Sequence, residues 1–422
     1  MKILVVGSGG REHAIIKKLK ESPNAEKIYA APGNGGISAD AECVDIKATD
    51  IKGVCEFAAK NAIDFVVVAP DDPLVLGMVD ALEEIGIPAF GPKKAAAAIE
   101  GSKVFSKWLM KKYNIPTAKY EAFEDVDRAI EYLKQQNSYP AVIKADGLAL
   151  GKGVIIPETE EDAIKGIRSM MEDGQFGDSG RRVVIEEFLT GIELSVLAFT
   201  DGNIVVPMVS SMDHKRAYDN DEGLNTGGMG TIAPHPMFTP EMQQRCMKEI
   251  FMPTIEAMKK ENREFRGCLY FGLMLCKDGP KVIEYNCRFG DPETQVVLPL
   301  LDGDLLEIMQ ATAAGKLADV NVGIKNGSAV CVIIASGGYP TSYKKGYAIH
   351  GLDQNGGHEG VCVYHAGTVL ENGVYKNNGG RVLGVTATGD SLQAALDKAY
   401  VAVSEIGFED SFYRHDIGKK VL

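Results

Sequence analysis

The sequence has 422 residues, 47 glycines, one tryptophan and a formal net charge of −13. This length predicts roughly two to four domains, because a single hydrophobic core stops growing well below it. The negative charge argues against a nucleic-acid or anionic-membrane partner, so anionic substrates would need local basic pockets.

The cysteines and the apolar segments indicate in which cellular compartment the protein is expected. None of the eight cysteines forms a C-x-x-C pair, which favours reduced, packed thiols over a disulfide frame or a zinc site. The apolar start Met1–Gly7 is too short for a signal peptide and is interpreted as a buried strand. No apolar run approaches the ~18 residues that span a bilayer. A cytoplasmic protein without a membrane partner is expected.

The first hundred residues predict a parallel sheet covered by helices, because apolar strands alternate with helical periodicity. The expected strands are residues 2–6, 27–30 and 65–68, and the expected helices are 11–20, 51–60 and 74–85. Three polar loops follow these strands, at residues 7–13, 32–36 and 70–73. Ligands bind at the carboxyl ends of such strands, and this glycine, amide and carboxylate chemistry suits a phosphorylated sugar. Ordinary turn chemistry is the alternative for each loop.

The first loop also resembles a dinucleotide fingerprint, but it fails the full pattern. The third glycine of G-x-G-x-x-G would fall at position 12, which is Glu12. NAD binding therefore remains a weak alternative.

Residues 119–187 predict a β-α-β-β-α-β unit. A glycine-rich hairpin at its centre carries Lys144 on a strand and Lys152 between Gly151 and Gly153. The hairpin is not a Walker A loop, because Gly153 stands where Ser or Thr is required and no helix follows. We expect a lid over the phosphates of a nucleotide, with a solvent-exposed basic hairpin as the alternative.

Two polar segments follow the lid. The strand at 183–189 could offer backbone groups to an adenine edge at Glu186, with Glu193 accepting ribose hydroxyls. Further on, the polar cluster 213–216 and the glycine-rich loop 223–230 could hold a developing anion by fixed donors. For His214 a positional role is favoured over general base, because no Ser or Cys nucleophile with triad spacing accompanies it.

A strand at residues 281–286 carries the most specific chemistry. Residues 240–260 predict an amphipathic helix, and residues 267–276 and 280–286 predict a hairpin around 277–279. Alternation along the second strand places Glu284, Asn286 and Arg288 on one face. A carboxylate and an amide oxygen suit Mg²⁺ carried by a nucleotide, and the arginine can grip a phosphate or carboxylate. A solvated strand face with a surface ion pair is the alternative.

The last hundred residues predict a small α+β domain after a linker at 320–327. Its expected strands are residues 330–335, 360–366 and 381–387, and its expected helix is 391–406. Arg381 follows two glycines and is a candidate phosphate contact.

Taken together, these motifs resemble the phosphoribosylamine–glycine ligase family of the ATP-grasp superfamily, in family order along the chain. The matching runs are residues 7–13, 31–34, 144–148, 151–154, 213–216, 225–230, 286–293, 366–368 and 379–381. The resemblance implies an N-terminal α/β substrate domain at 1–101, an ATP-grasp domain at 102–325 with a lid at about 119–187, and a C-terminal α+β domain at 326–422.

The resemblance also implies an activity: ATP-dependent ligation of glycine to 5-phosphoribosylamine through glycyl phosphate, an early step of purine synthesis. It implies Mg²⁺ or Mn²⁺ at Glu284 and Asn286, and catalytic roles for Arg288, Asp213 and Lys215. The implied ATP contacts are Lys103, Lys144, Gly147, Gly151, Lys152, Gly153, Glu186, Glu187, Leu189 and Glu193. The implied substrate contacts are Gly9, Gly10, Asn34, Asp71, Asn225, Thr226, Gly227 and Arg381. A monomer or weak homo-oligomer is expected.

Three departures from the family pattern stand out. Asp71 is one methylene shorter than the expected glutamate, Leu150 replaces a small lid residue, and the strand before Glu284 offers no acidic metal ligand. The alternatives left open are another ATP-grasp carboxylate–amine ligase, an NAD-dependent dehydrogenase and a non-enzymatic nucleotide sensor.

Overall fold

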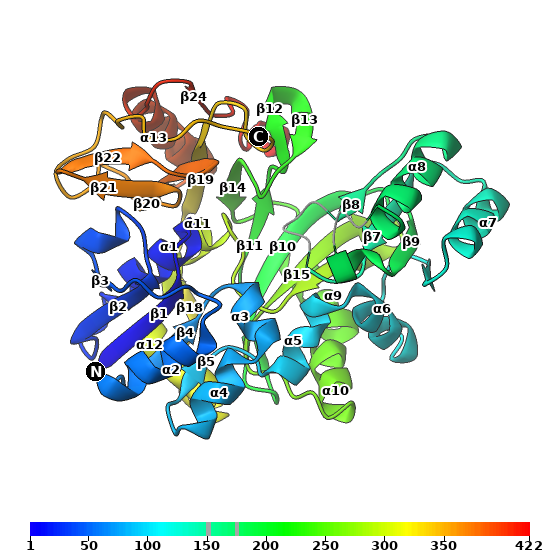
Figure 1. Cartoon of the computed structure of the whole chain (residues 1–422), viewed down its shortest axis with the longest axis horizontal. Helices are drawn as coiled ribbons and strands as arrows, with labels where there is room; N and C mark the ends of the chain where they lie inside the picture. The colour runs from blue at the N-terminus through cyan, green and yellow to red at the C-terminus, as the bar shows by residue number, and fades with distance from the viewer. Residues whose placement is uncertain (149–152, 174–176) are drawn as a thin grey trace.

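The computed structural model describes residues 1–148, 153–173 and 177–422. An N-terminal lobe and a C-terminal lobe flank a central sheet, and a small α/β subdomain projects from the opposite side (Figure 1). The expected fold class is confirmed by this arrangement.

The N-terminal lobe contains a five-stranded sheet in the order β3-β2-β1-β4-β5, with every pair parallel. Its strands are β1 (Lys2–Gly7), β2 (Lys27–Pro32), β3 (Glu42–Cys43), β4 (Phe65–Val68) and β5 (Ala89–Phe90). Its helices are α1 (Gly10–Leu19), α2 (Ile51–Lys60), α3 (Asp71–Leu76), α4 (Met78–Glu84) and α5 (Lys94–Gly101). The parallel sheet predicted from the alternating pattern is confirmed.

The single helix predicted over residues 74–85 is wrong. The chain forms α3 and α4 instead, because Gly77 adopts φ +99° in the left-handed region and ends α3. The first of the two helices begins at Asp71, whose carboxylate therefore lies at a helix N-terminus beside the end of β4.

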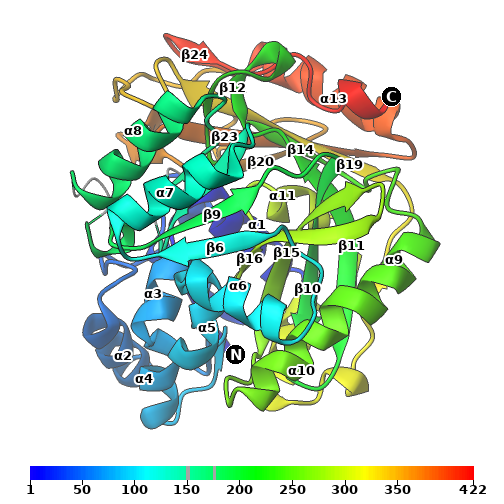
Figure 2. The ribbon, with the colours of Figure 1, turned by 90° about the vertical axis from the view of Figure 1, so that its right-hand side faces the viewer.

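The β-α-β-β-α-β unit predicted at 119–187 is confirmed as the projecting subdomain. Its sheet has the order β6-β9-β7-β8, and α7 and α8 cover one face (Figure 2). The elements are β6 (Tyr120–Phe123), α7 (Val126–Gln136), β7 (Ala141–Ala145), β8 (Val154–Ile155), α8 (Glu160–Met171) and β9 (Val183–Glu187). Helix α6 (Lys103–Lys112) connects α5 to this subdomain.

The central sheet is antiparallel and runs β16-β15-β10-β11-β14-β19-β23-β20, with β24 pairing β19 at the side. Its first strands are β10 (Ile192–Thr200), β11 (Val205–Asp213), β14 (Gly230–Ala233), β15 (Gly267–Cys276) and β16 (Gly279–Asn286). Its C-terminal strands are β19 (Ser328–Ser336), β20 (Cys362–His365), β23 (Arg381–Gly389) and β24 (Ser411–Phe412). The predicted 267–286 hairpin is confirmed as β15 and β16.

Helices and short strand pairs complete the fold. The helical stretch predicted at 240–260 is confirmed as α9 (Pro240–Cys246), a π-helical turn (Met247–Phe251) and α10 (Met252–Lys260). The remaining helices are α11 (Thr294–Val297), α12 (Leu305–Ala314) and α13 (Leu392–Glu405). The remaining strand pairs are β12 (Arg216–Tyr218) with β13 (Glu222–Asn225), β17 (Leu301–Asp302) with β18 (Gly323–Ile324), and β21 (Thr368–Glu371) with β22 (Val374–Asn377).

The linker predicted at 320–327 is wrong in part, because β18 lies inside it. Ile324 pairs with Leu301, and the Lys325 amide donates to the Leu300 carbonyl at 2.8 Å. A two-residue strand is too short to produce a periodic signal, so the sequence pattern could not show it.

The two faces of the N-terminal sheet pack into two separate cores that both include the central sheet. Leu4 of β1 shares a cluster with Phe271 of β15, whereas Ile3 shares one with Cys331 of β19. These cores fix the carboxyl ends of the parallel strands against the end of β16. All eight cysteines are free, and no helix among the described residues is long and apolar enough to span a membrane.

Candidate active site

Glu284 on β16 occupies the centre of a cationic pocket. Four cationic side chains surround its carboxylate: Lys215, Lys144, Lys103 and Arg288. Burial alone would raise the pKa of Glu284, but these four charges outweigh burial and lower it. Among the described residues, no hydrogen bond or ion pair engages this carboxylate. Glu284 is therefore an ionised oxygen donor that remains free to bind a cation.

Asn286 lies two residues further along the same strand face and is the second predicted oxygen ligand. This carboxylate and amide pair is a hard-oxygen set that fits Mg²⁺ delivered with a nucleotide. No group of three or more His, Cys, Asp or Glu suited to a metal occurs among the described residues, so phosphate oxygens and water would complete the coordination. On β15 the residue opposite Glu284 is Gly272, so the neighbouring strand contributes no acid there.

Two lysines predicted to contact phosphate converge on this strand from other elements. Lys144 of β7 donates to the Ile283 carbonyl at 3.0 Å, next to Glu284. Lys103, in the first turn of α6, donates to the Gly147 carbonyl at 2.7 Å, and burial lowers its pKa. Both ammonium groups are thus held by backbone carbonyls, one just after β7 and the other on β16.

Glu186 of β9 is committed to a buried ion network that sequence reasoning did not foresee. Its carboxylate pairs with Lys107 at 2.7 Å and with Lys144 at 3.0 Å. Burial would raise the pKa of Glu186, but the two lysines lower it. Only the backbone of this residue is left to meet an adenine edge, as the sequence interpretation requires.

The other predicted ATP contacts lie along the same edge. Glu187 is exposed and accepts from the Lys119 amide at 2.9 Å, while Leu189 is half-buried. Glu193 forms an ion pair with Lys215 at 2.5 Å, so a ribose hydroxyl would share this carboxylate with a lysine. The Gly153 carbonyl accepts from the Ala145 amide at 2.8 Å and closes the hairpin. Gly151, Lys152 and Leu150 lie outside the described residues.

Asp213 and Glu293 form a second acidic centre next to Lys215. Burial raises the pKa of both carboxyls, and the charge of Glu293 raises the pKa of Asp213 further. The buried Oδ1 of Asp213 has no hydrogen-bond partner among the described residues. A Cβ on Gly228 would come within 2.6 Å of this oxygen, so the glycine-rich loop can close over Asp213 only without a side chain. This pair is equipped to receive a positively charged group.

Arg288 lies just beyond the end of β16 and joins two carboxylates from the N-terminal lobe. Its guanidinium lies 3.0 Å from Glu100 Oε1 and 3.6 Å from Asp71 Oδ2. Arg288 and Arg11 outweigh the effect of burial and lower the pKa of Asp71. The buried Nε of Arg288 has no partner among the described residues and remains a free donor at the site.

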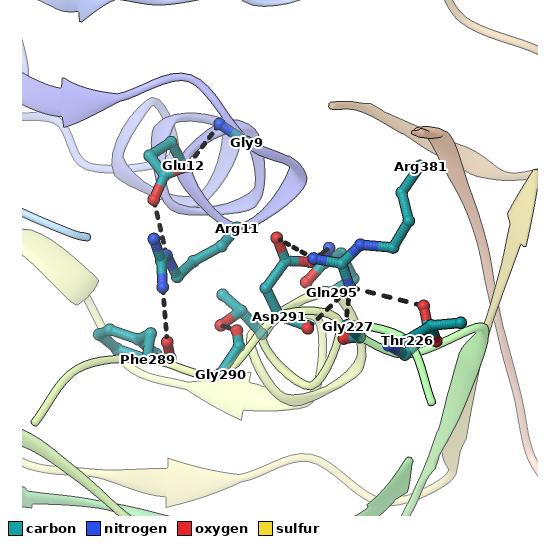
Figure 3. A network of polar contacts seen from close by, with 12 residues as sticks. Gly9, Arg11, Glu12, Thr226, Gly227, Phe289, Gly290, Asp291, Gln295 and Arg381 are labelled. Atoms are coloured by element: carbon teal, nitrogen blue, oxygen red, sulfur yellow. Dashed lines mark hydrogen bonds and ion pairs between the residues drawn. The ribbon is translucent and has the colours of Figure 1, made fainter. Parts of the chain in front are cut away.

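The first glycine-rich loop is closed by its own helix (Figure 3). The Gly9 amide donates to Glu12 Oε2 at 2.5 Å, and Glu12 Oε1 accepts from Arg11 at 2.6 Å. Arg11 also donates to the Phe289 carbonyl at 3.2 Å, which links the loop to the segment after β16. Glu12 thus caps α1 where a dinucleotide fingerprint requires glycine, and its negative charge disfavours a pyrophosphate there.

Arg381 links the remaining predicted substrate loops (Figure 3). It pairs with Asp291 Oδ2 at 3.1 Å and donates to the carbonyls of Asp291 and Gly227 at 2.9 and 2.6 Å. Thr226 Oγ1 donates to the Lys215 carbonyl at 2.8 Å, so this loop also fixes the backbone of Lys215. Asn225 is the exposed end of β13. The guanidinium of Arg381 is largely used by protein groups, so its role at the site is partly to hold loops together.

Asn34 and Gly10 lie at the interface with the C-terminal lobe. The Asn34 amide nitrogen donates to the carbonyls of Ser8 and His365, both at 2.8 Å, and its oxygen accepts from the amides of Gly36 and Ile37. These four bonds saturate the side chain, so any contact of Asn34 with substrate would use its backbone. A Cβ on Gly10 would come within 2.8 Å of Gln295 Nε2, which explains the glycine there.

The sequence analysis did not single out Glu100, Lys107 and Glu293, which the structure places among the predicted site residues. Glu100 and Lys107 flank the predicted contact Lys103 on α5 and α6, but each occupies an ordinary amphipathic position whose buried partner lies far along the chain. Glu293 belongs to the 286–293 run, which was the one available signal. His214 binds backbone through both ring nitrogens, to Gly230 and Gly418, as a positional role requires.

Comparison with known proteins extends these observations to the whole chain. Models of phosphoribosylglycinamide synthetase match in three parts: the N domain at residues 1–100, the ATP-grasp (A) domain at 101–294 and the C domain at 329–420. A phosphoribosylamine–glycine ligase of Caldanaerobacter subterraneus subsp. tengcongensis is 50% identical over 99% of this chain and 99% of its own. Its counterpart in Clostridium acetobutylicum is 48% identical over 99% and 100% of the two chains.

Solved structures show the same relationship. The crystal structure of phosphoribosylamine–glycine ligase from Thermotoga maritima superimposes with a TM-score of 0.87 at 35% identity, over 99% of this chain and 100% of that one. The biotin carboxylase domain of a Hydrogenobacter thermophilus 2-oxoglutarate carboxylase gives a TM-score of 0.74 at 18% identity over 98% and 91%, which shows a shared fold. With all three domain models matched in order, the chain belongs to the phosphoribosylglycinamide synthetase family.

Proposed function

We propose that this protein is the ATP-dependent ligase that joins glycine to 5-phosphoribosylamine, giving glycinamide ribonucleotide, ADP and phosphate in purine biosynthesis. The observation that carries the proposal is the convergence of four cationic side chains on the free carboxylate of Glu284, in a chain that matches relatives of this name over its full length. A different carboxylate–amine ligase is not favoured, because those relatives share the same name and match this chain over nearly its full length.

ATP and a divalent cation, Mg²⁺ or Mn²⁺, are the required partners of this reaction. Glu284 and Asn286 would hold the cation, which when bound neutralises charge on the phosphates. Lys103 and Lys144 would contact the polyphosphate, and Gly147 and Gly153 would belong to the lid over it. Gly151 and Lys152, which lie outside the described residues, are the remaining proposed lid contacts. The backbone from Glu186 through Glu187 to Leu189 meets the adenine, and Glu193 meets the ribose.

Chemistry occurs between the lid and the second acidic centre. An oxygen of the glycine carboxylate attacks the γ-phosphorus, the bond to the β,γ-bridging oxygen breaks, and ADP leaves. Arg288 and Lys215 offset the charge on the resulting glycyl phosphate, while Asp213 faces the amino groups. The amine nitrogen of phosphoribosylamine then attacks the acyl carbon, phosphate leaves with the C–O electron pair, and the nitrogen loses a proton. Exclusion of water by the lid protects the acyl phosphate from hydrolysis.

The sugar amine would bind where the N-terminal lobe meets the ends of β16 and β14. Gly9, Gly10, Asn34 and Asp71 approach from the parallel sheet, and Asn225, Thr226, Gly227 and Arg381 approach from the opposite side. This placement supports division of the chain into a substrate domain at 1–101, an ATP-grasp domain at 102–325 with a lid at about 119–187, and a C-terminal domain at 326–422. We propose a cytoplasmic enzyme that is a monomer or a weak homo-oligomer.

The decisive assay measures phosphate release from ATP with glycine and with phosphoribosylamine formed in situ from ribose 5-phosphate and ammonia. We expect release only when glycine, the amine and a divalent cation are all present. Release without the amine would indicate hydrolysis of glycyl phosphate. Absence of release in the complete mixture would contradict the proposed substrates.

A further inference from the structure

Glu100 is a buried carboxylate, 8% exposed, that contacts Arg288 and the backbone just after β16. It lies near the end of α5, at the last position matched by the N domain model. Its Oε2 accepts from the Cys287 amide at 2.7 Å, and its Oε1 forms an ion pair with Arg288 Nη2 at 3.0 Å. In the orientation that satisfies the Asn286 amide, the Asn286 nitrogen also donates to Glu100 Oε1 at 3.0 Å.

All three neighbours of Glu100 are donors, and this requires a carboxylate. The backbone N–H of Cys287, the guanidinium of Arg288 and the amide nitrogen of Asn286 together call for two oxygens that only accept. A glutamine of the same shape would turn its NH₂ group toward at least one of these donors. A buried donor facing a donor loses a hydrogen bond and keeps the cost of its desolvation.

The contact to Asn286 decides which atom of the amide is presented to the site. Because the planar amide directs its nitrogen to Glu100, its oxygen faces away from Glu100 and becomes the group available to a cation. Without Glu100, only the longer contact of this nitrogen to the Tyr285 carbonyl at 3.3 Å would favour the same orientation. The amide could then rotate and present N–H groups, which bind no metal. The contact to Arg288 likewise holds the guanidinium beyond the end of β16. Glu100 and Asp71 are the two carboxylates beside this guanidinium.

The segment that carries Glu100 also reaches the lid. Ser102 Oγ donates to Asp146 at 3.0 Å, and Lys103 donates to the Gly147 carbonyl at 2.7 Å. Asp146 additionally pairs with Arg182 across the lid base. Residues 100–103 therefore contact the metal strand at one end and the lid hairpin at the other.

We propose that Glu100 is a positioning residue, which orients the oxygen of Asn286 toward the divalent cation and fixes Arg288 for the acyl phosphate. The proposal rests on the proposed function, in which Asn286 is a metal ligand and Arg288 handles the acyl phosphate. Partners that orient metal ligands commonly contribute about 10–100-fold to metal affinity or activity.

The test compares Glu100→Gln and Glu100→Asp with Glu83→Gln. Glu83 is a matched control because it lies in the same lobe and pairs with the exposed Lys93, so the control removes one negative charge far from β16. Mn²⁺ is titrated by electron paramagnetic resonance in the presence of a non-hydrolysable ATP analogue. Steady-state kcat and KM are measured on the same preparations, after thermal melts show that each is folded at the assay temperature.

We expect Glu100→Gln to weaken Mn²⁺ binding and lower kcat by about 10–100-fold each. The KM for the sugar amine should change less, because the amine does not touch Glu100. Glu100→Asp keeps both acceptor oxygens but withdraws them by one methylene, so it should bind Mn²⁺ more weakly than the wild type and more tightly than the glutamine variant. Glu83→Gln should match the wild type.

Wild-type Mn²⁺ affinity and kcat in folded Glu100→Gln would overturn the proposal, as would equal loss in the control. If the glutamine variant does not fold, Glu100→Asp decides the matter, since wild-type Mn²⁺ affinity in it would also contradict the assignment. Failure of the wild type to need glycine and the amine would overturn the proposed function instead. The Mn²⁺ titration would still test the positioning role of Glu100, because it requires only the metal and the nucleotide analogue.

Discussion

The buried ion network around Glu186 allows a quantitative prediction for the lid. In Glu186→Gln, Lys107 and Lys144 lose the carboxylate that lies 2.7 and 3.0 Å from their ammonium groups. All three side chains are at most 5% exposed, so solvent cannot replace the lost charge. Removing one partner from a buried ion pair costs about 3–5 kcal/mol.

The expected loss lies near the lower end of that range. Lys107 keeps its hydrogen bond to Thr117 Oγ1 at 2.8 Å, and Lys144 keeps its bond to the Ile283 carbonyl at 3.0 Å. We therefore expect Glu186→Gln to lower the free energy of unfolding by about 3 kcal/mol, which corresponds to a Tm decrease of roughly 6–12 °C for a domain of ordinary size. The KM for ATP should also rise, because Lys144 loses one of the two contacts that hold it beside Glu284.

Differential scanning calorimetry at pH 7 measures the Tm of the wild type and of each variant. Glu121→Gln is the control, because Glu121 is an exposed carboxylate on β6 of the same sheet and should change stability by less than about 0.5 kcal/mol. The loss in Glu186→Gln should shrink near pH 9, because burial lowers the pKa of Lys107 to about 8 and part of the charge is already gone there. A Tm within 1 °C of the control at pH 7 would refute the reasoning.

Three further predictions concern other parts of the site. Glu284→Gln should abolish glycine-dependent phosphate release and weaken Mn²⁺ binding, and near-normal turnover at saturating Mg²⁺ would exclude Glu284 as a ligand. Asp71→Ala should raise the KM for the sugar amine with little change for ATP, whereas a defect confined to ATP would place Asp71 elsewhere. His214 is neutral in the fold because burial lowers its pKa from 6.5 to about 4. The unfolded chain therefore binds the extra proton between these values, and stability should fall by up to about 3 kcal/mol as the pH drops from 6.5 to 4. His214→Gln should flatten that slope in urea titrations, and an unchanged slope would contradict the assignment.

The fold was accessible from the sequence wherever periodicity extended over a whole element. The parallel strands of the N-terminal lobe, the lid unit and the β15–β16 hairpin all show apolar alternation or helical spacing, and the structure confirms them. The break at Gly77 escaped detection because a single glycine inside a helical pattern is usually tolerated. The short strand β18 escaped because its pairing with β17 depends on a backbone contact between residues more than twenty positions apart.

The site residues likewise differ in whether a local sequence pattern reveals them. Glu284, Asn286 and Arg288 could be identified because strand alternation and a recognisable run place them together. Glu100 and Lys107 could not, because their roles depend on partners 187 and 79 residues away. Asn34 shows a different limit, since its loop position predicts a ligand contact but does not show that four backbone groups saturate its amide.

The charge distribution explains how an acidic protein can bind anionic substrates. The net charge of −13 gives no attraction at long range, because exposed charges are screened beyond a Debye length of about 10 Å. At short range the situation reverses, since Lys103, Lys144, Lys215 and Arg288 all act on Glu284. Each of these cations is itself held by a carbonyl or a carboxylate, so none needs to move when the phosphates arrive. Affinity for ATP should therefore depend on these four positions and on their buried supports, and only weakly on the charge of the outer surface.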